Sequence, residues 1–121
     1  MIVITGASDG LGQELAKVLV AKGEQVISLS RSNAKQATET ITTDLTNPDS
    51  IKVAVDTLLA RDEPITGLVN CAGILSFQKL QELTPKNIND VFAVNVTGPM
   101  LLVSGLAERL KNDQASIVNV A

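Results

Sequence analysis

Three glycines between a short apolar run and an amphipathic stretch constrain the fold of this chain more than any other feature. Residues 2–4 are apolar and β-branched, which predicts a short buried strand. After the glycines, apolar residues recur with helical spacing, at Leu11, Leu15, Val18 and Leu19. Gly23 is placed to end that helix. A strand that turns through a glycine loop into a helix is the first unit of a parallel α/β sheet.

Short apolar runs and longer amphipathic stretches alternate along the rest of the chain. We expect further strands at residues 26–30, 40–43, 68–70 and 116–120, of which the Thr-rich second one suits a sheet edge. Asn47-Pro48 and Thr84-Pro85 each place a capping side chain before a proline, which predicts two helix starts. The second of these helices runs to about residue 111. The apolar face of the first one consists of Ile51, Val55, Leu58 and Leu59.

The order of these elements predicts one α/β domain over residues 1–121, with a parallel sheet between two layers of helices. The segment 32–39 is too short and polar for a crossover helix, so we expect a turn or a stub of helix there. Of the 121 residues, 45% are hydrophobic, which excludes disorder as a description of the whole chain.

Composition also excludes several classes of function. Ten basic and thirteen acidic residues give a net charge of −3 without a basic stripe, so we expect no nucleic-acid partner. No apolar run reaches the roughly 18 residues of a membrane span and no leader is recognisable, so we expect a cytoplasmic protein with no membrane partner. Cys71 is the single cysteine, which excludes a disulfide within the chain, and it has no histidine beside it, which argues against a metal site. We therefore expect a small, largely buried side chain.

The strongest motif is the loop Thr5-Gly6-Ala7-Ser8-Asp9-Gly10-Leu11-Gly12. Gly6 permits a tight turn out of the strand, and Gly10 lets a pyrophosphate approach the backbone N–H groups at the positive end of the helix. Gly12 lets the helix and the sheet pack closely. An ordinary glycine turn is the alternative, but three glycines between a strand and a helix favour a dinucleotide loop.

This loop resembles the cofactor loop of the short-chain dehydrogenase/reductase family. Four later segments are similar to motifs of the same family, namely Asp44-Leu45, Asn70-Cys71-Ala72-Gly73, Asn95-Val96-Thr97-Gly98 and residues 117–121. The resemblance covers the whole chain. It implies a Rossmann-type, doubly wound parallel sheet in three α/β/α layers, with five strands present and the carboxyl-terminal part missing. It also implies cofactor-binding residues at Gly6, Ser8, Gly10, Leu11, Gly12, Asp44, Leu45, Asn70, Ala72 and Gly73.

Two of these assignments have a simpler alternative. Asp44 resembles the acidic adenine contact of the family, but it could be an exposed turn residue ahead of Asn47-Pro48. Asn70 resembles a residue that lines the cofactor ribose, but it could merely tie the end of its strand to neighbouring backbone.

The residues at the end of the second strand are expected to decide which nucleotide binds. In dinucleotide folds an acidic residue here accepts from both ribose hydroxyls and repels a 2′-phosphate. This chain has Ser30-Arg31-Ser32, in which Arg31 presents a planar guanidinium to a phosphate and a serine adds a hydroxyl donor. We therefore predict Arg31 and Ser32 as cofactor contacts and NADP(H) in preference to NAD(H). Against this, Arg31 could be a solvated surface charge, and Asp9 places a carboxylate in the phosphate loop unless it caps the first helix.

Asn95 is a polar residue on the apolar stripe of the long helix, which consists of Ile88, Phe92, Leu102 and Leu106. A buried amide needs partners, so a structural asparagine bonded to nearby backbone is one interpretation. The resemblance implies the other, in which Asn95 is the catalytic asparagine whose backbone carbonyl holds a water in a proton relay. Pro99 has no N–H to give to that carbonyl, which favours the second interpretation.

Reduction of a carbonyl by a nicotinamide needs a proton donor, a group that lowers the pKa of the donor and a group that polarises the oxygen. The family uses a Tyr-x-x-x-Lys motif and a serine after the fifth strand, whereas this chain contains no Tyr and no His. We therefore expect the amino-terminal half of an NADP(H)-dependent oxidoreductase that acts on a small carbonyl or alcohol, is inactive alone and forms homo-oligomers at full length. The alternatives are a non-catalytic NAD(P)-binding module, a truncated pseudo-enzyme, and a nucleotide-sugar epimerase. The last is disfavoured because Asp9 replaces a glycine of Thr-Gly-x-x-Gly-x-x-Gly.

Overall fold

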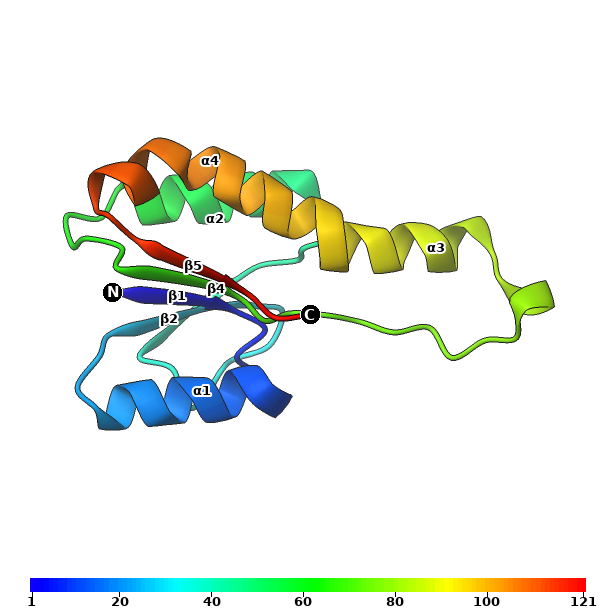
Figure 1. The fold of residues 1–121 in the computed structure, drawn as a ribbon, viewed down its shortest axis with the longest axis horizontal. Coiled ribbons are helices and arrows are strands. Elements are labelled where there is room, and N and C mark those ends of the chain that lie inside the picture. Colours follow the sequence, from blue (N-terminus) through cyan, green and yellow to red (C-terminus); the bar gives the residue numbers. More distant parts are fainter.

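A five-stranded, all-parallel sheet forms the middle of the computed structural model, which describes residues 1–121 (Figure 1). The spatial order of the strands is β3-β2-β1-β4-β5. Their bounds are β1 Ile2–Thr5, β2 Val26–Ser30, β3 Glu39–Thr42, β4 Gly67–Asn70 and β5 Ser116–Asn119. All five lie within one or two residues of the positions predicted from hydrophobic runs, and the Thr-rich β3 occupies an edge as expected.

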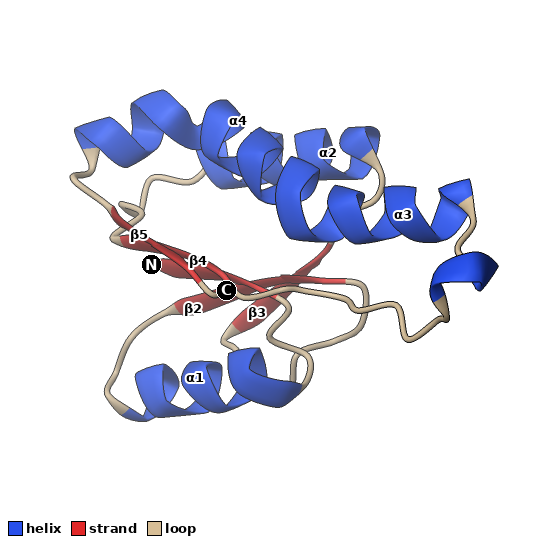
Figure 2. Ribbon diagram, turned by 45° about the vertical axis from the view of Figure 1, so that its right-hand side comes forward, coloured by secondary structure: helices blue, strands red, loops and turns tan.

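Helices cover both faces of this sheet (Figure 2). Helix α1 lies on one face, whereas α2 and α4 lie side by side on the other. The helical bounds are α1 Gly10–Ala21, α2 Pro48–Leu59, η1 Leu80–Glu82, α3 Pro85–Phe92, η2 Ala93–Thr97 and α4 Gly98–Asn112. The structure is therefore a Rossmann-type, doubly wound sheet in three α/β/α layers, and the predicted fold class is confirmed. Segment 32–39 contains turns and no helix, as expected.

The strand order places a crevice where a ligand site is expected. The chain leaves β1 through α1 toward β2 on one side, and returns through α2 to β4 on the other side of β1. The direction of winding thus reverses between β1 and β4, at the carboxyl ends of both strands. In open α/β sheets, ligands bind at such a switch point.

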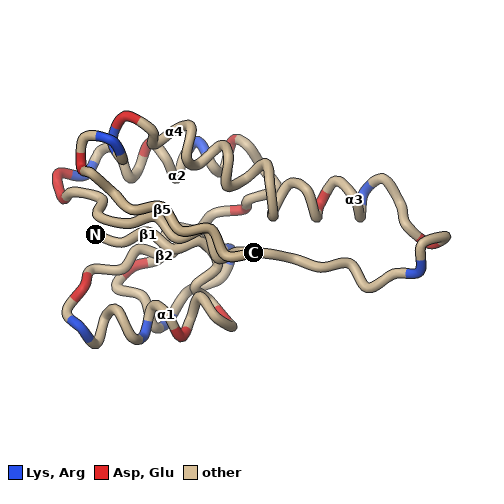
Figure 3. Tube along the Cα trace, in the orientation of Figure 1, with Lys and Arg blue, Asp and Glu red and all other residues tan.

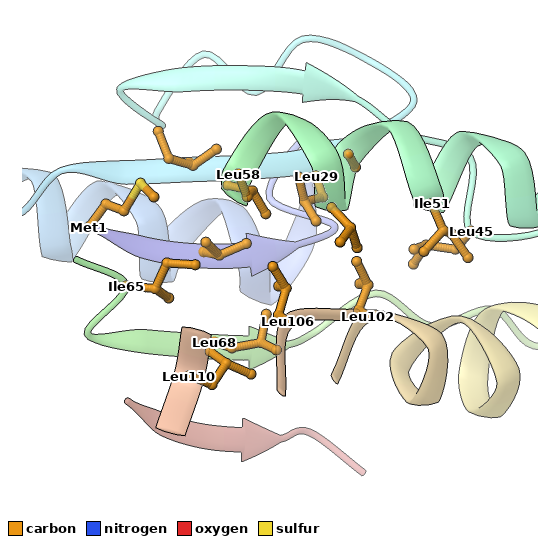
Figure 4. Packing of buried hydrophobic residues seen from close by; sticks show 14 residues of the cluster. Met1, Leu29, Leu45, Ile51, Leu58, Ile65, Leu68, Leu102, Leu106 and Leu110 are labelled. Atoms are coloured by element: carbon orange, nitrogen blue, oxygen red, sulfur yellow. The ribbon is translucent and has the colours of Figure 1, made fainter. Parts of the chain in front are cut away.

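Two hydrophobic clusters hold the layers together. The larger one has fourteen buried residues and lies between the sheet and the α2–α4 pair (Figure 4). It includes Leu58 of α2 and Leu102 and Leu106 of α4, none of which is exposed to solvent. The smaller one has six buried residues under α1. Burial of such leucine side chains contributes about 1.5–3 kcal/mol each, which makes the α2–α4 side the main support of the sheet.

The helix ends follow the expected capping chemistry with one exception. The Asn47 side chain accepts hydrogen bonds from the backbone of Asp49 and Ser50, and Thr84 forms a capping box with Asn87. Gly23 has φ +86 and its N–H donates to the Val20 carbonyl, which ends α1. Asp9 occupies the N-cap position of α1, but its side chain forms no capping bond.

The predicted apolar faces of α1 and α2 are partly wrong. Leu11 and Val18 of α1 are 62% and 49% exposed, and the buried positions of that helix are Gly12 and Ala16. Gly12 is small because the start of α1 packs against the glycine loop, and Ala16 belongs to the cluster between α1 and the sheet. On α2, Leu59 is 43% exposed, and Ala54 is buried beside Ile51, Val55 and Leu58.

The long helix is divided by a π-helical turn. In η2, the Gly98 N–H donates to the carbonyl of Ala93, five residues earlier. The additional residue in this turn rotates the faces of α3 and α4 relative to each other. The predicted apolar stripe is buried along only part of its length, because Leu102 and Leu106 are buried whereas Ile88 and Phe92 are 45% and 59% exposed and α3 has no buried residue. Helix α3 also extends beyond the carboxyl ends of the strands (Figure 1).

One helical stretch is long and apolar enough to cross a membrane by length and composition. It is the helical stretch Pro85–Asn112, in which polar residues interrupt the apolar ones, so that unbroken apolar runs did not predict it. Core helices of soluble proteins meet the same criteria, and Leu102 and Leu106 of this stretch pack against the sheet. Both acidic and basic positions occur on each of the helices α1, α2, α3 and α4 (Figure 3).

Candidate functional site

A cavity of about 650 Å³ opens at the carboxyl ends of β1, β2 and β4. Five loop segments and one helix line it. The loop segments are the glycine loop, the segment after β2, the segment Thr43–Thr46 after β3, the segment Cys71–Ile74 after β4, and Val120 after β5. The helix contributes the face of α3 and η2 that carries Lys86, Asp90 and Val94. The cavity therefore lies at the switch point of the sheet.

The glycine loop forms the floor of this cavity in a conformation that requires two of its glycines. Gly6 and Gly10 have φ of +73 and +52, values that residues with side chains rarely adopt. A Cβ at Gly12 would lie 2.4 Å from the Gly6 carbonyl oxygen, so Gly12 lets the helix start pack onto the loop itself rather than onto the sheet. A Cβ at Gly10 would meet no atom within 4 Å and would stand in the open space of the cavity.

This geometry fits a phosphate group. Helix α1 begins at Gly10, and its first N–H groups have no acceptor within the helix. A helix start of this kind attracts anions through free N–H donors and the positive end of the helix dipole. The open space at Gly10 leaves room for a phosphate to reach these donors. The loop can therefore hold the pyrophosphate of a dinucleotide.

Thr5 connects the glycine loop to the segment after β4, a contact that the sequence did not suggest. Its side chain is fully buried, and Oγ1 accepts hydrogen bonds from the N–H groups of Cys71 and Ala72, both at 3.0 Å. Ala72 in turn lies close to Gly6, where an added Cβ would be 2.8 Å from its Cα. Thr5 therefore fixes the relative position of two walls of the cavity. The only sign of this contact in the sequence is that Thr5 is a polar residue at the end of a buried strand.

Arg31 lines the cavity after β2 and is exposed. Its guanidinium has no salt-bridge partner in the chain, whereas Arg61 and Arg109 are both paired with carboxylates. Ser32 lines the cavity beside it. The hydroxyl of Ser30, by contrast, donates to the Ser32 carbonyl oxygen at 2.7 Å, so Ser32 is the serine available to a ligand.

Asp44 lines the cavity from the segment after β3, with one carboxylate oxygen already engaged. Its Oδ1 accepts from the Thr46 hydroxyl at 2.7 Å and from the Thr46 N–H at 2.9 Å. These bonds from Thr46 lower the pKa of Asp44 below its usual value, and the charge of Arg31 lowers it further. Asp44 is therefore an ionised acceptor at neutral pH whose Oδ2 has no hydrogen-bond partner in the chain.

Two further features of the cavity were not predicted as site elements. Lys86, Asp90 and Val94 recur every four residues along α3 and η2, so one face of this helix closes the cavity. Lys86 and Asp90 form an ion pair with each other. Cys71 also lines the cavity, and burial raises the pKa of its thiol, which keeps it protonated and weakly nucleophilic.

A second, smaller cavity of about 220 Å³ lies beside the first and is lined by Asn70, Asn95, Asn119 and Pro99, among other residues. Asn70 is 4% exposed, and its Nδ2 donates to Asn119 Oδ1 at 2.8 Å. Asn70 Oδ1 is buried and has no partner. Among the twelve residues predicted to contact the cofactor, Asn70 alone lies outside the larger cavity.

The Asn95 side chain is exposed, contrary to the burial expected from its stripe, and it forms two hydrogen bonds with one residue. Its Oδ1 accepts from the Ile74 N–H at 2.8 Å, and its Nδ2 donates to the Ile74 carbonyl at 2.9 Å. The expectation of a side chain bonded to nearby backbone is therefore met. Asn95 lies inside the π-helical turn η2, a kind of turn that is frequent at functional sites. Its catalytic role stays a prediction.

The other predicted residues come together as a group. The larger cavity is lined by Gly6, Ser8, Gly10, Leu11, Gly12, Arg31, Ser32, Asp44, Leu45, Ala72 and Gly73. They come from four loops that are far apart in the sequence. The parallel sheet brings them together because the carboxyl ends of its strands share one edge.

Comparisons with known proteins agree with this arrangement. A family model described as "short chain dehydrogenase" matches residues 1–121. The chain is 34% identical over 131 residues to the L-xylulose reductase of Caenorhabditis elegans, a match that covers 99% of this chain and 52% of that protein. The chain spans about half the length of the curated relatives it matches.

Solved structures are similar in the same way. A 4-hydroxyisoleucine dehydrogenase complexed with NADH and succinate has a TM-score of 0.90 and 27% identity, covering 100% of this chain and 58% of that one. A metagenomic short-chain oxidoreductase in complex with NADP has a TM-score of 0.89 and 27% identity, covering 100% of this chain and 60% of that one. The similar structures thus include complexes with both kinds of nicotinamide nucleotide.

Proposed function

The chain belongs to the short chain dehydrogenase family, and we propose that it supplies the nucleotide site of an NADP(H)-dependent oxidoreductase acting on a small carbonyl or alcohol. The observation that carries this proposal is the cavity in which the glycine loop and Arg31 line the same space. When bound, the nicotinamide nucleotide supplies or accepts a hydride.

The chain's own residues would bind and orient the nucleotide. The glycine loop and the start of α1 would hold its pyrophosphate, and the ionised Asp44 would accept a hydrogen bond from the adenine. Asn95 would act through its backbone carbonyl, which receives no N–H from Pro99, by holding a water that moves a proton. Asn70 and Asn119, which line the same small cavity, would shape that end of the site.

Arg31 is the basis of the proposed preference for NADP(H). It is a free guanidinium at the rim of the cavity, and a charge-assisted bond to a 2′-phosphate contributes about 1.5–3 kcal/mol. Asp9 opposes this preference, because its carboxylate also lines the cavity and forms no capping bond. The larger effect is that of Arg31, since only this side chain can form the bidentate contact.

Isothermal titration calorimetry on the 121-residue chain tests this preference. NADPH should bind at least about tenfold more tightly than NADH, and Arg31→Ala should reduce the difference to about threefold or less by removing the charge-assisted bond. Lys22→Ala makes the same change of charge at an exposed position after α1 and should leave the difference intact. Equal affinities of the unmodified chain for NADPH and NADH would refute the role of Arg31.

We further propose that the 121-residue chain binds the nucleotide without reducing carbonyls. It contains no Tyr and no His, so the tyrosine proton donor used by the family is missing. Incubation of the chain with NADPH and a panel of aldehydes and ketones should give no loss of NADPH absorbance above the blank. Turnover would show that another group donates the proton, whereas binding without turnover also fits a non-catalytic NAD(P)-binding module.

A further inference from the structure

Two segments that line the larger cavity contact the same short stretch of helix. Ile74, after β4, is held by the two hydrogen bonds of the Asn95 side chain. Leu45, after β3, lies against Gly98, where an added Cβ would be 3.1 Å from the Leu45 carbonyl oxygen and 3.2 Å from its Cβ. Residues 95–98 therefore contact both Leu45 and Ile74.

We propose that this stretch sets the separation of the two segments, and that Gly98 is a positioning residue for the adenosine end of the nucleotide. The proposal rests on the proposed function, because it assumes that the cavity binds an adenine nucleotide. Leu45 and Ile74 supply apolar surface to the same cavity, which suits the faces of a flat purine ring. Their separation then decides whether the ring fits.

Close contact, and not backbone conformation, explains why position 98 lacks a side chain. Gly98 has φ −57 and ψ −54, which is ordinary helical geometry that any residue adopts. A glycine in a helix costs about 1 kcal/mol relative to alanine, so local stability alone would favour alanine. A methyl group would crowd Leu45 and the Ala93 carbonyl oxygen, which is 3.0 Å from an added Cβ, and these neighbours would have to shift by a few tenths of an ångström.

A displaced Leu45 would act on the ligand through its neighbour. Asp44 is held by Thr46, and both residues lie in the same segment as Leu45. A shift of a few tenths of an ångström at Leu45 therefore moves the carboxylate that would accept from the adenine. Ser50 also ties this segment to α2, through a hydrogen bond from the Asp44 N–H at 2.9 Å, so the segment cannot yield without strain.

Gly105 provides a matched control within the same helix. A Cβ at Gly105 would lie 3.0 Å from both methyl groups of Val55, a contact as tight as the one at Gly98. Val55 belongs to the core between α2 and α4 and does not line the cavity. Gly105→Ala thus repeats the substitution and the crowding without touching the proposed site.

The test measures the binding of 2′,5′-ADP, the adenosine end of NADP, by calorimetry, together with unfolding in urea. Because small misplacements in a site cost affinity steeply, Gly98→Ala should weaken 2′,5′-ADP about fivefold or more, and Gly105→Ala less than about twofold. Unchanged binding in Gly98→Ala, or equal losses in both variants, would overturn the positioning role. If Gly98→Ala does not fold, Asn95→Ala releases the Ile74 side instead and should weaken 2′,5′-ADP by a similar factor; unchanged affinity would overturn the proposal.

The outcomes separate this inference from the function on which it rests. If the unmodified chain does not bind 2′,5′-ADP, the proposed function fails and the inference falls with it. If the unmodified chain binds 2′,5′-ADP and Gly98→Ala binds it equally well, only the inference fails.

Discussion

Replacement of Gly12 by alanine is expected to abolish nucleotide binding and to lower the free energy of unfolding by about 3 kcal/mol. An added Cβ would lie 2.4 Å from the Gly6 carbonyl oxygen, 2.9 Å from the Gly6 carbonyl carbon and 3.1 Å from the Ala7 Cα. All three atoms belong to the backbone, so no side chain can rotate away. Either the start of α1 or the glycine loop must move, and both form the floor of the cavity.

Urea unfolding and calorimetry with NADPH measure the two effects of Gly12→Ala. Gly23→Ala is the control for a left-handed glycine, because position 23 has φ +86, open space around it and lies outside the cavity. It should cost about 1 kcal/mol of stability without loss of affinity. Gly10→Ala, at φ +52, should cost a similar amount and also weaken binding, since its methyl group would stand in the cavity. A Gly12→Ala chain that binds NADPH normally would contradict the assignment of the loop.

Thr5→Val is expected to lower the free energy of unfolding by about 2–4 kcal/mol, with little change in the size of the side chain. The Thr5 hydroxyl oxygen accepts from two backbone N–H groups, those of Cys71 and Ala72. Valine replaces this oxygen by a methyl group and leaves both donors without a partner. An unpaired buried donor costs about 1–3 kcal/mol, so the loss of two exceeds the effect of most single substitutions.

Nucleotide affinity should fall together with stability in Thr5→Val, because Cys71 and Ala72 line the cavity. Thr5→Ser is the matched variant, since it keeps the oxygen and removes only a methyl group. It should retain most of the affinity and lose about 1 kcal/mol, in line with the burial of one methyl group. If Thr5→Val lost no more stability than Thr5→Ser, the two hydrogen bonds would contribute no more than the methyl group, and the role assigned to the Thr5 hydroxyl would be wrong.

The positions of the strands and the class of the fold could be predicted from the sequence. Buried strands such as Val26–Ser30 read as short apolar runs, and helix starts such as Asn47-Pro48 carry a capping side chain beside a proline. The glycine spacing also predicted the loop at the carboxyl end of β1. All of these signals are local, because strand pleating, helical periodicity and capping act over a few neighbouring residues.

The faces of the helices were harder to predict. Periodicity placed Val18 and Leu59 on buried faces, but both are exposed, because their burial depends on how far each helix extends over the sheet. Ile88 and Phe92 are exposed for the same reason, since α3 extends beyond the carboxyl ends of the strands (Figure 1) and has no buried residue. Pro99 indicated that one helical hydrogen bond to the Asn95 carbonyl is missing, but it did not predict the π-helical geometry of the turn.

Most of the candidate site follows from local motifs, whereas its internal contacts do not. The glycine loop, Arg31 and Asp44 each follow a strand, and a parallel sheet necessarily brings the ends of its strands to one edge. The bond from Cys71 to Thr5 spans 66 residues, the pairing of Asn95 with Ile74 spans 21, and Gly98 meets Leu45 from another element entirely. No local pattern in the sequence predicts such contacts, because they depend on the distance between elements after the chain has packed. The local pattern of residues thus specifies the elements and the edge where the site forms, and the packing of α4 and the loops against the sheet specifies its shape.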